Sequence, residues 1–197
     1  MLNLSYLLPM AVETVKDPRA VANRLMALNL PRDALWQSLA LVVVVSILLA
    51  EIGAIFMGGL PDAAEGSVFI SPLRMGLIQL SLLVMMVFAI FWIGHAVGGG
   101  GRFQDGLAMV VWLQFCMVCL QVVQTVALLV IPALAWVIGV FGLVMFLWLL
   151  THFIAVVHGF QSLAKTFVMI VVSSFGFAFG LSIILALIGV SIPGMEQ

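Results

Sequence analysis

Residues 34–57 read ALWQSLALVVVVSILLAEIGAIFM, and this stretch decides the fold. Its apolar run is broken only by Gln37, Ser38, Ser46 and Glu51. The hydrocarbon core of a bilayer is about 30 Å thick and is crossed by about 20 apolar helical residues. No water is available there, so every backbone N–H and C=O must be paired within the segment, which requires a helix. The stretch is therefore predicted to be a transmembrane helix.

Four further apolar segments follow, and residues that end or start helices separate them. These boundaries fall at Gly58–Asp62, Ser71-Pro72, Gly98–Gly101, Pro132, the polar connection His158–Ser162, and Pro193-Gly194. The segments between them predict transmembrane helices at about 73–97, 106–131, 133–157 and 166–190. The sequence thus predicts an all-α, polytopic integral membrane bundle of five transmembrane helices. It divides into an N-terminal cytoplasmic or interfacial segment, 1–33, and a transmembrane domain, 34–197.

The composition agrees with a chain that is solvated mostly by lipid. Apolar residues make up 65% of the 197 residues and charged residues only 8%, against about 25% charged in a soluble domain. The net charge of −1 argues against nucleic acid as a partner, because that binding needs a concentrated basic surface. The lipid bilayer is the partner that the composition requires.

A short amphipathic helix is predicted from Pro18 to Leu28, ahead of the first span. Asp17 suits the N-cap, and Pro18 suits the first helical position because its missing N–H costs nothing there. Apolar residues recur at helical spacing along one side. This stripe is expected to lie against the membrane or the bundle. Residues 1–15 are mixed in character, and we expect them near the membrane surface.

The basic residues predict the orientation of the bundle. Six of them fall in segments on the N-terminal side, namely Lys16, Arg19, Arg24, Arg32, Arg102 and Lys165, and only Arg74 falls on the other side. Basic residues in short loops stay in the cytoplasm, which predicts a cytoplasmic N-terminus and a C-terminus outside. The membrane expected is a bacterial inner membrane. Arg19, Arg24 and Arg32 form the candidate cytoplasmic interface for a protein partner.

Polar residues inside the spans form a candidate intramembrane site. Glu51 lies toward the outer end of the first span, where it must be protonated or find a partner in the bundle, because an isolated carboxylate there costs about 2.5–3.5 kcal/mol. The third span carries Gln114, Gln121, Gln124 and Thr125, whose offsets place them on one helix face. These groups either line a pathway for a proton or ion, or act as hydrogen-bonded contacts between helices. The second interpretation is the simpler one.

The cysteines, the histidines and the glycine run do not form a recognisable catalytic or cofactor-binding motif. Cys116 and Cys119 sit mid-span without a second ligand pair, as small hydrophobes do. His95, His152 and His158 have no nearby carboxylates, so they favour contacts at helix ends over a metal centre. The glycine run fits neither common phosphate-binding pattern and is expected to be a flexible turn. The sequence therefore predicts no catalytic residues, no cofactor and no metal.

Small residues predict close helix contacts. Gly176 and Gly180 are four residues apart in the fifth span, and Ala50, Ala54 and Gly58 form a similar face in the first. Such faces serve the fold by default, and a homo-oligomer is the alternative.

The layout of these features resembles the Yip family, the small five-span membrane proteins named for interacting with Ypt/Rab GTPases, and specifically its bacterial branch. Three motifs carry the resemblance: residues 14–19 (TVKDPR), the glycine-rich turn 98–103, and residues 148–152 (WLLTH) followed by His158-Gly159-Phe160. The resemblance covers nearly the whole chain. It implies a non-enzymatic membrane scaffold or adaptor with protein partners and no catalytic residues. The alternative is a small transporter or channel subunit that uses Glu51 and the Gln114/Gln121 face.

Overall fold

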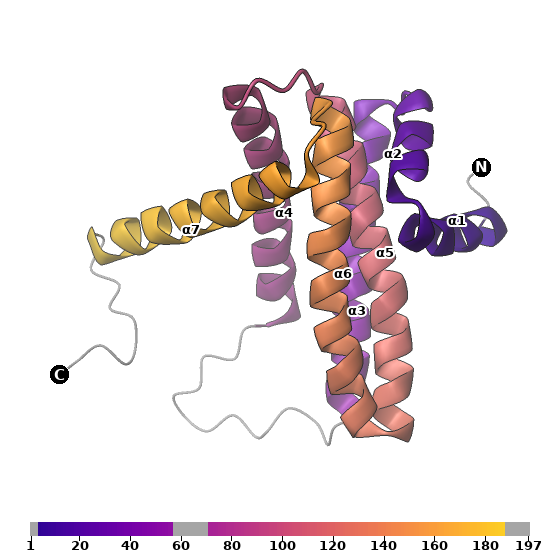
Figure 1. The fold of residues 1–197 in the computed structure, drawn as a ribbon. Helices are drawn as coiled ribbons and strands as arrows, with labels where there is room; N and C mark the ends of the chain where they lie inside the picture. Colours follow the sequence, from indigo (N-terminus) through magenta and orange to yellow (C-terminus); the bar gives the residue numbers. More distant parts are fainter. Residues whose placement is uncertain (1–3, 57–70, 188–197) are drawn as a thin grey trace.

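The computed structural model of the chain describes residues 4–56 and 71–187. Within these residues the fold is all-helical and contains no strand (Figure 1). The helices are α1 (Leu4–Lys16), α2 (Pro18–Ala27), α3 (Arg32–Phe56), α4 (Pro72–Ala96), α5 (Phe103–Val130), α6 (Pro132–His158) and α7 (Leu163–Leu187). Helices α3 to α7 are each long and apolar enough to cross a membrane. The chain is an integral membrane protein of the class that the sequence predicts.

The predicted spans agree closely with the observed helices, since each boundary that lies inside the described residues falls within three residues of the prediction. Local chemistry explains the agreement. The side chain of Ser71 caps α4 by accepting a hydrogen bond from the Arg74 N–H at 3.4 Å, and prolines occupy the first positions of α4 and α6. Gly159 ends α6 in the left-handed region, at φ 71°, which glycine adopts without steric cost. The predictions made for Gly58, for the turn 58–62 and for the C-terminal tail fall outside the described residues.

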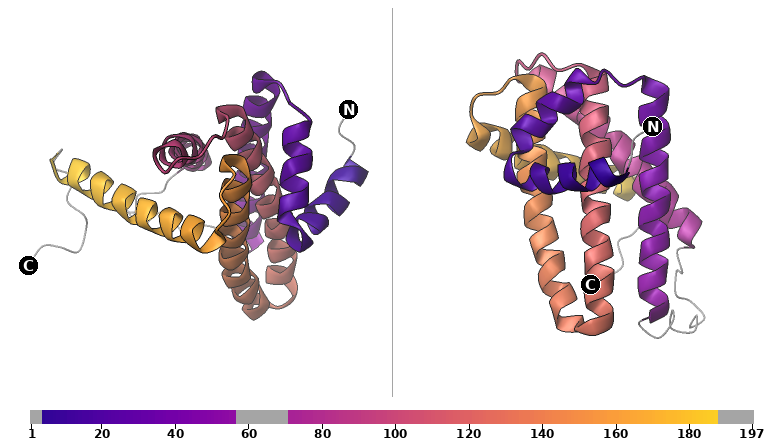
Figure 2. Two further views of the ribbon diagram at one scale, coloured as in Figure 1. Left: turned by 45° about the horizontal axis from the view of Figure 1, so that its top comes forward. Right: turned by 90° about the vertical axis from the view of Figure 1, so that its right-hand side faces the viewer.

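Helix α5 is the centre of the packing. It lies against α3 on one side and α6 on the other, and it also contacts α4 (Figure 2). The largest fully buried side chains include Leu39 of α3, Leu107 and Leu113 of α5, and Leu149 and Phe153 of α6. The core is therefore concentrated along α5, where α3 packs on one side and α6 on the other, and much of the outer surface of the bundle is left to lipid.

The predicted amphipathic helix is present as α2, one residue shorter than expected. The N-cap is confirmed, because the Asp17 side chain accepts a hydrogen bond from the Ala20 N–H at 3.0 Å. Val21, Ala22 and Leu25 are buried, and α2 packs on α6 and α5. Of the two expected positions for the apolar stripe, against the membrane or against the bundle, the structure has the second.

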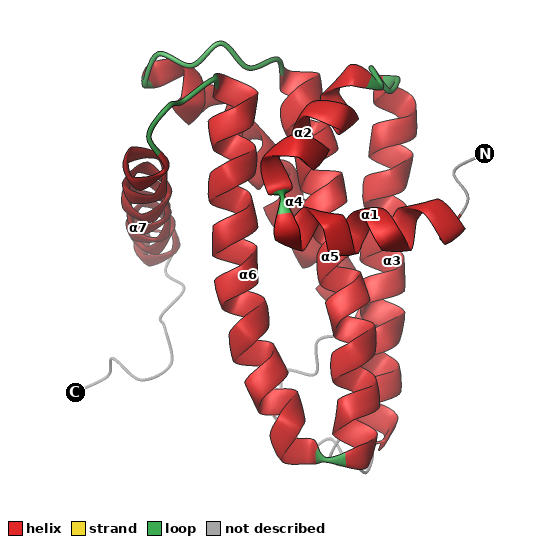
Figure 3. Cartoon of the chain, turned by 45° about the vertical axis from the view of Figure 1, so that its right-hand side comes forward, coloured by secondary structure: helices red, strands yellow, loops and turns green. Residues whose placement is uncertain are grey.

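Helices α1 and α7 lie across the bundle instead of along it (Figures 1 and 3). Helix α1 was not predicted as a helix. Helix α7 packs against α6, with Thr166 and Ile170 buried near its start, and Phe175 and Phe179 farther along are exposed. Nothing lies within 4 Å of a Cβ placed on Gly176 or Gly180. In the structure, therefore, no other described helix packs on these two glycines.

Candidate functional site

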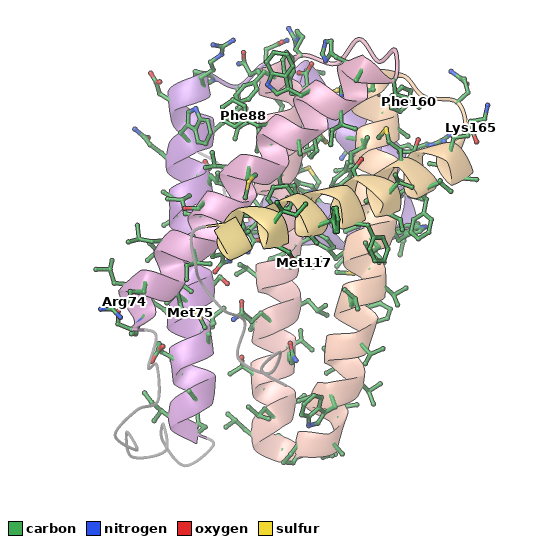
Figure 4. All side chains as sticks on the ribbon, turned by 90° about the vertical axis from the view of Figure 1, so that its left-hand side faces the viewer. Arg74, Met75, Phe88, Met117, Phe160 and Lys165 are labelled. Carbon is green, nitrogen blue, oxygen red and sulfur yellow. The ribbon has the colours of Figure 1, made fainter. Side chains whose placement is uncertain are left out.

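One end of the bundle gathers most of the polar groups, and we call it the basic end. It consists of α2, the glycine turn 97–102 and the connection 159–162. Figure 4 shows Lys165 toward this end, and Arg74 at the start of α4, farther toward the opposite end. The two residues thus lie on the sides that the distribution of basic residues in the sequence predicts.

The three arginines of the candidate interface differ in how they are engaged. The Arg24 guanidinium binds the Glu13 carboxylate through two hydrogen bonds of 2.9 Å, which join α2 to α1. The hydrogen bonds with Glu13 raise the pKa of Arg24. Arg19 and Arg32 are exposed, and neither forms an ion pair in the part of the chain that the structure describes. Two of the three are thus available to a ligand or a partner.

Arg102 ties the basic end together from the other side. Its guanidinium binds the Asp105 carboxylate at 2.9 Å and donates to the Asn29 side-chain oxygen at 3.1 Å. The hydrogen bonds with Asp105 raise the pKa of Arg102. The Gln104 amide also donates to the Leu30 carbonyl. The α2–α3 connection is therefore held against the start of α5.

His158 is a buried polar side chain at this end, only 6% exposed. It lies in a pocket of glycines, because a Cβ on Gly94 or Gly99 would come within 2.2 Å and 2.5 Å of its ring. Its Nε2 lies 3.0 Å from the Ile90 carbonyl oxygen, and its Nδ1 accepts from the Gly101 N–H at 3.3 Å. A carbonyl accepts and an N–H donates, so Nε2 carries the proton and the imidazole is neutral. The glycine turn is packed on this ring, which differs from the expected flexible connection.

The other two histidines do not join His158 in a metal site. His95 and His152 each donate from Nδ1 to the carbonyl four residues earlier, those of Phe91 and Trp148, both at 2.8 Å. His95 meets His158 edge-on, with ring centroids 5.6 Å apart. Among the described residues, no three His, Cys, Asp or Glu side chains are placed to hold a metal ion.

A polar cluster that includes one residue of the predicted site, Gln121, joins three helices inside the bundle. The Gln79 amide of α4 donates to the Ser46 hydroxyl of α3 at 3.3 Å. The Gln121 amide of α5 donates to the Ser46 backbone carbonyl at 2.9 Å. The signal for this cluster was present in the sequence, because Ser46 and Gln79 are isolated polar residues within apolar spans.

The predicted glutamine face is divided between two helix interfaces. Gln121 bonds to α3, whereas the Gln124 amide donates to the Ala135 carbonyl of α6 at 3.2 Å. The Thr125 hydroxyl donates to the Gln121 carbonyl of its own helix at 2.9 Å. Gln114 and Glu51 are half-buried, and neither forms a hydrogen bond or ion pair with any described residue. The structure places these groups along the helices and does not assemble them into one site.

An apolar groove lies between α4, α6 and α7. It has a volume of 330 Å³, and residues from all three helices line it, including Met86, Leu150 and Phe177. Ser173 and Ser174 are its polar members, and the Ser174 hydroxyl is already bonded to the Ile170 carbonyl at 2.8 Å. With so few polar groups the groove suits hydrocarbon.

The family profile of the Yip1 domain matches residues 12–187. The chain belongs to the Yip1 family. The matched range begins within α1 and extends through α7, so the glycine turn, the His158 pocket and the basic end are all parts of this Yip1 domain. No curated protein and no solved structure matches the chain.

Proposed function

We propose that this Yip1-family protein is a non-enzymatic membrane scaffold or adaptor that recruits protein partners through its basic end. The observation that carries the proposal is the presence of two exposed arginines, Arg19 and Arg32, without ion pairs among the described residues. Arg24 and Arg102, by contrast, are bound to acidic residues of the same chain. An acidic segment of a partner would meet complementary charge there.

The internal polar groups support a structural role for the membrane domain. The amides of Gln79, Gln121 and Gln124 bond to other helices of the same chain. Amides used in this way hold helices together, each contributing about 0.6 kcal/mol. They are therefore engaged in the fold and do not line a continuous polar path.

The orientation belongs to the same proposal. Six of the seven basic residues fall on the N-terminal side, so we place the N-terminus in the cytoplasm and the C-terminus outside. We also place the protein in the inner membrane of a bacterium, as the resemblance to the bacterial branch of the family implies. The basic end then faces the cytoplasm, where soluble partners are available.

Crosslinking in native membranes, followed by affinity capture of the full-length protein, tests the proposal. The variant is Arg19→Gln with Arg32→Gln, and Arg74→Gln at the opposite end is the matched control. Arg24 is left unchanged because it holds α1 to α2. Captured partners should be lost from the double variant and kept by the control. Equal recovery from all three proteins would contradict a docking role for the basic end.

A further inference from the structure

Helix α1 is held firmly across the side of the bundle. Thr14 is fully buried, and its hydroxyl accepts from the Trp112 indole N–H at 2.9 Å while donating to the Met10 carbonyl at 2.7 Å. Met10 and Ala11 are buried beside it. Figure 3 shows α1 lying crosswise in front of the transmembrane helices. Its position along the bundle is therefore set by specific contacts with α5.

The contact with Trp112 gives the depth of α1 in the membrane. Helix α5 has 28 residues, about 42 Å at 1.5 Å per residue, which exceeds the hydrocarbon thickness of about 30 Å by roughly 6 Å at each end. Trp36 packs beside Phe103 at the start of α5, with ring centroids 6.4 Å apart, as expected for a tryptophan at the interface. Trp112 lies about 13 Å along α5 from Phe103. With α5 upright and centred in the bilayer, Thr14 of α1 would lie roughly 7 Å inside the hydrocarbon boundary, within the range of about 5–10 Å for in-plane helices.

The side chains of α1 suit this depth. Its outer face exposes Tyr6, Leu8, Val12 and Val15, with Val12 60% exposed. Lys16 at its end and Arg19 just beyond it are exposed as well, and their long side chains carry the charges up to the headgroup level. Large apolar side chains of the transmembrane helices, such as Leu41 and Val44 of α3, are exposed in the same way. The carboxylate of Glu13 would be costly in hydrocarbon, and the bidentate contact with Arg24 neutralises it.

We propose that α1 is an in-plane helix inserted among the acyl chains of the leaflet at the basic end, and that it makes the protein widest in that leaflet. A helix of 13 residues is about 20 Å long and about 10 Å wide. Among the described residues no helix lies across the opposite end of the bundle. The protein therefore concentrates in membranes that are convex on the side of the basic end. Helix α7 is long and apolar enough to cross the membrane, and a crossing helix would not widen one leaflet. The proposal therefore rests on α1 alone.

The depth is tested by spin labels on the full-length protein in lipid vesicles, in a background where Cys116 and Cys119 are replaced by alanine. Labels at Leu8→Cys and Val12→Cys should be accessible to oxygen and inaccessible to a water-soluble nickel chelate. Val44→Cys is the lipid-facing control, and Asn23→Cys, on the exposed side of α2, is the aqueous control. Nickel accessibility at both α1 sites would overturn the insertion. Protection from both reagents would also overturn it, because a second copy or another protein would then cover the face.

The shape is tested by pulling narrow tubes outward from giant vesicles. A membrane-impermeant dye on Asn23→Cys marks only the molecules whose basic end faces outward. These molecules should be enriched in the tube relative to a lipid dye, and Leu8→Ser with Val12→Ser should abolish the enrichment. Val44→Ser, a change of the same kind on α3, should retain it. Equal densities in tube and vesicle for the parent protein would overturn the curvature preference, whatever the accessibility result.

Discussion

At the scale of single residues, the His158 ring packs so closely on three glycines that there is no room for a larger side chain at any of them. The ring is buried, both of its nitrogens are bonded, and Gly94, Gly99 and Gly101 lie against it or against Val157. The contact joins the end of α6 to the end of α4 and to the turn that leads into α5. A side chain larger than hydrogen at these glycines would separate the three elements.

Gly94→Ala should therefore destabilise the protein. The added Cβ would lie 2.2 Å from the His158 ring, and overpacking of this kind costs about 1–3 kcal/mol. We expect a lower thermal unfolding midpoint for the purified protein in detergent. Gly100→Ala is the matched control, because nothing lies within 4 Å of its Cβ position. Equal midpoints for the two variants would show that the ring yields without cost.

At the scale of elements, two kinds of contact hold the helices together. Apolar packing joins α5 to α3 and α6, and single hydrogen bonds pin particular pairs of helices. Trp112 with Thr14 docks α1 on α5, and Ser46 connects α3 with Gln79 of α4 and Gln121 of α5. The hydrogen bond between Trp112 and Thr14 is buried, whereas the bonds to Ser46 are only partly buried. Their contributions to stability should therefore differ.

Thr14→Val should weaken the docking of α1. The change keeps the volume but leaves the indole N–H of Trp112 without an acceptor, and an unpaired buried donor costs about 1–3 kcal/mol. The free energy of unfolding should fall by this amount in a denaturant titration in micelles. Thr125→Val is the control, since that hydroxyl bonds only within its own helix. In the Trp112→Phe background Thr14→Val should cost much less, and an unchanged cost there would exclude the hydrogen bond as the cause.

Gln121→Leu should have a smaller effect. It removes one hydrogen bond between α5 and α3, for which about 0.6 kcal/mol is typical inside membranes. Gln114→Leu on the same helix is the control, because Gln114 bonds to no described residue and should show no loss. The same titration measures both variants. A loss at Gln121 that did not exceed the loss at Gln114 would mean that the bond to Ser46 contributes nothing to stability.

The elements were largely predictable, and the contacts between them were not. The spans and α2 follow from local signals, namely apolar runs, the Asp17 cap and prolines at helix starts. Helix α1 was missed because its sequence is mixed and contains Pro9, which lacks an N–H for the helix ladder. The His158 pocket joins residues 57 and 68 positions apart, and no local pattern encodes such a contact. The offsets placed the glutamines on one helix face but could not show that Gln121 and Gln124 bond to different neighbours.

At the scale of the whole molecule, charge and shape distinguish the two ends of the bundle. The basic end carries α2, the packed glycine turn and the exposed arginines Arg19 and Arg32. The opposite end of the α5–α6 pair is apolar, with Val130, Ile131 and Trp136 exposed around the turn. This difference favours one orientation in the membrane. Whether α7 crosses the membrane or stays across the bundle decides on which side of the membrane the C-terminus lies.

Two reporter fusions test the orientation and the crossing of α7 separately. With a reporter that is active only in the cytoplasm, a fusion after Gln161 should be bright and a fusion after Gln197 dark. The physical reason is the apolar stretch Leu163–Gly180, which crosses the membrane if α7 turns about the connection 159–162 to run along α4 and α6. A reporter that is active only after export should give the reverse pattern. Two bright fusions would mean that α7 stays across the bundle, with both fusion points on one side. A dark fusion after Gln161 would mean instead that the basic end faces outward, because that connection belongs to it.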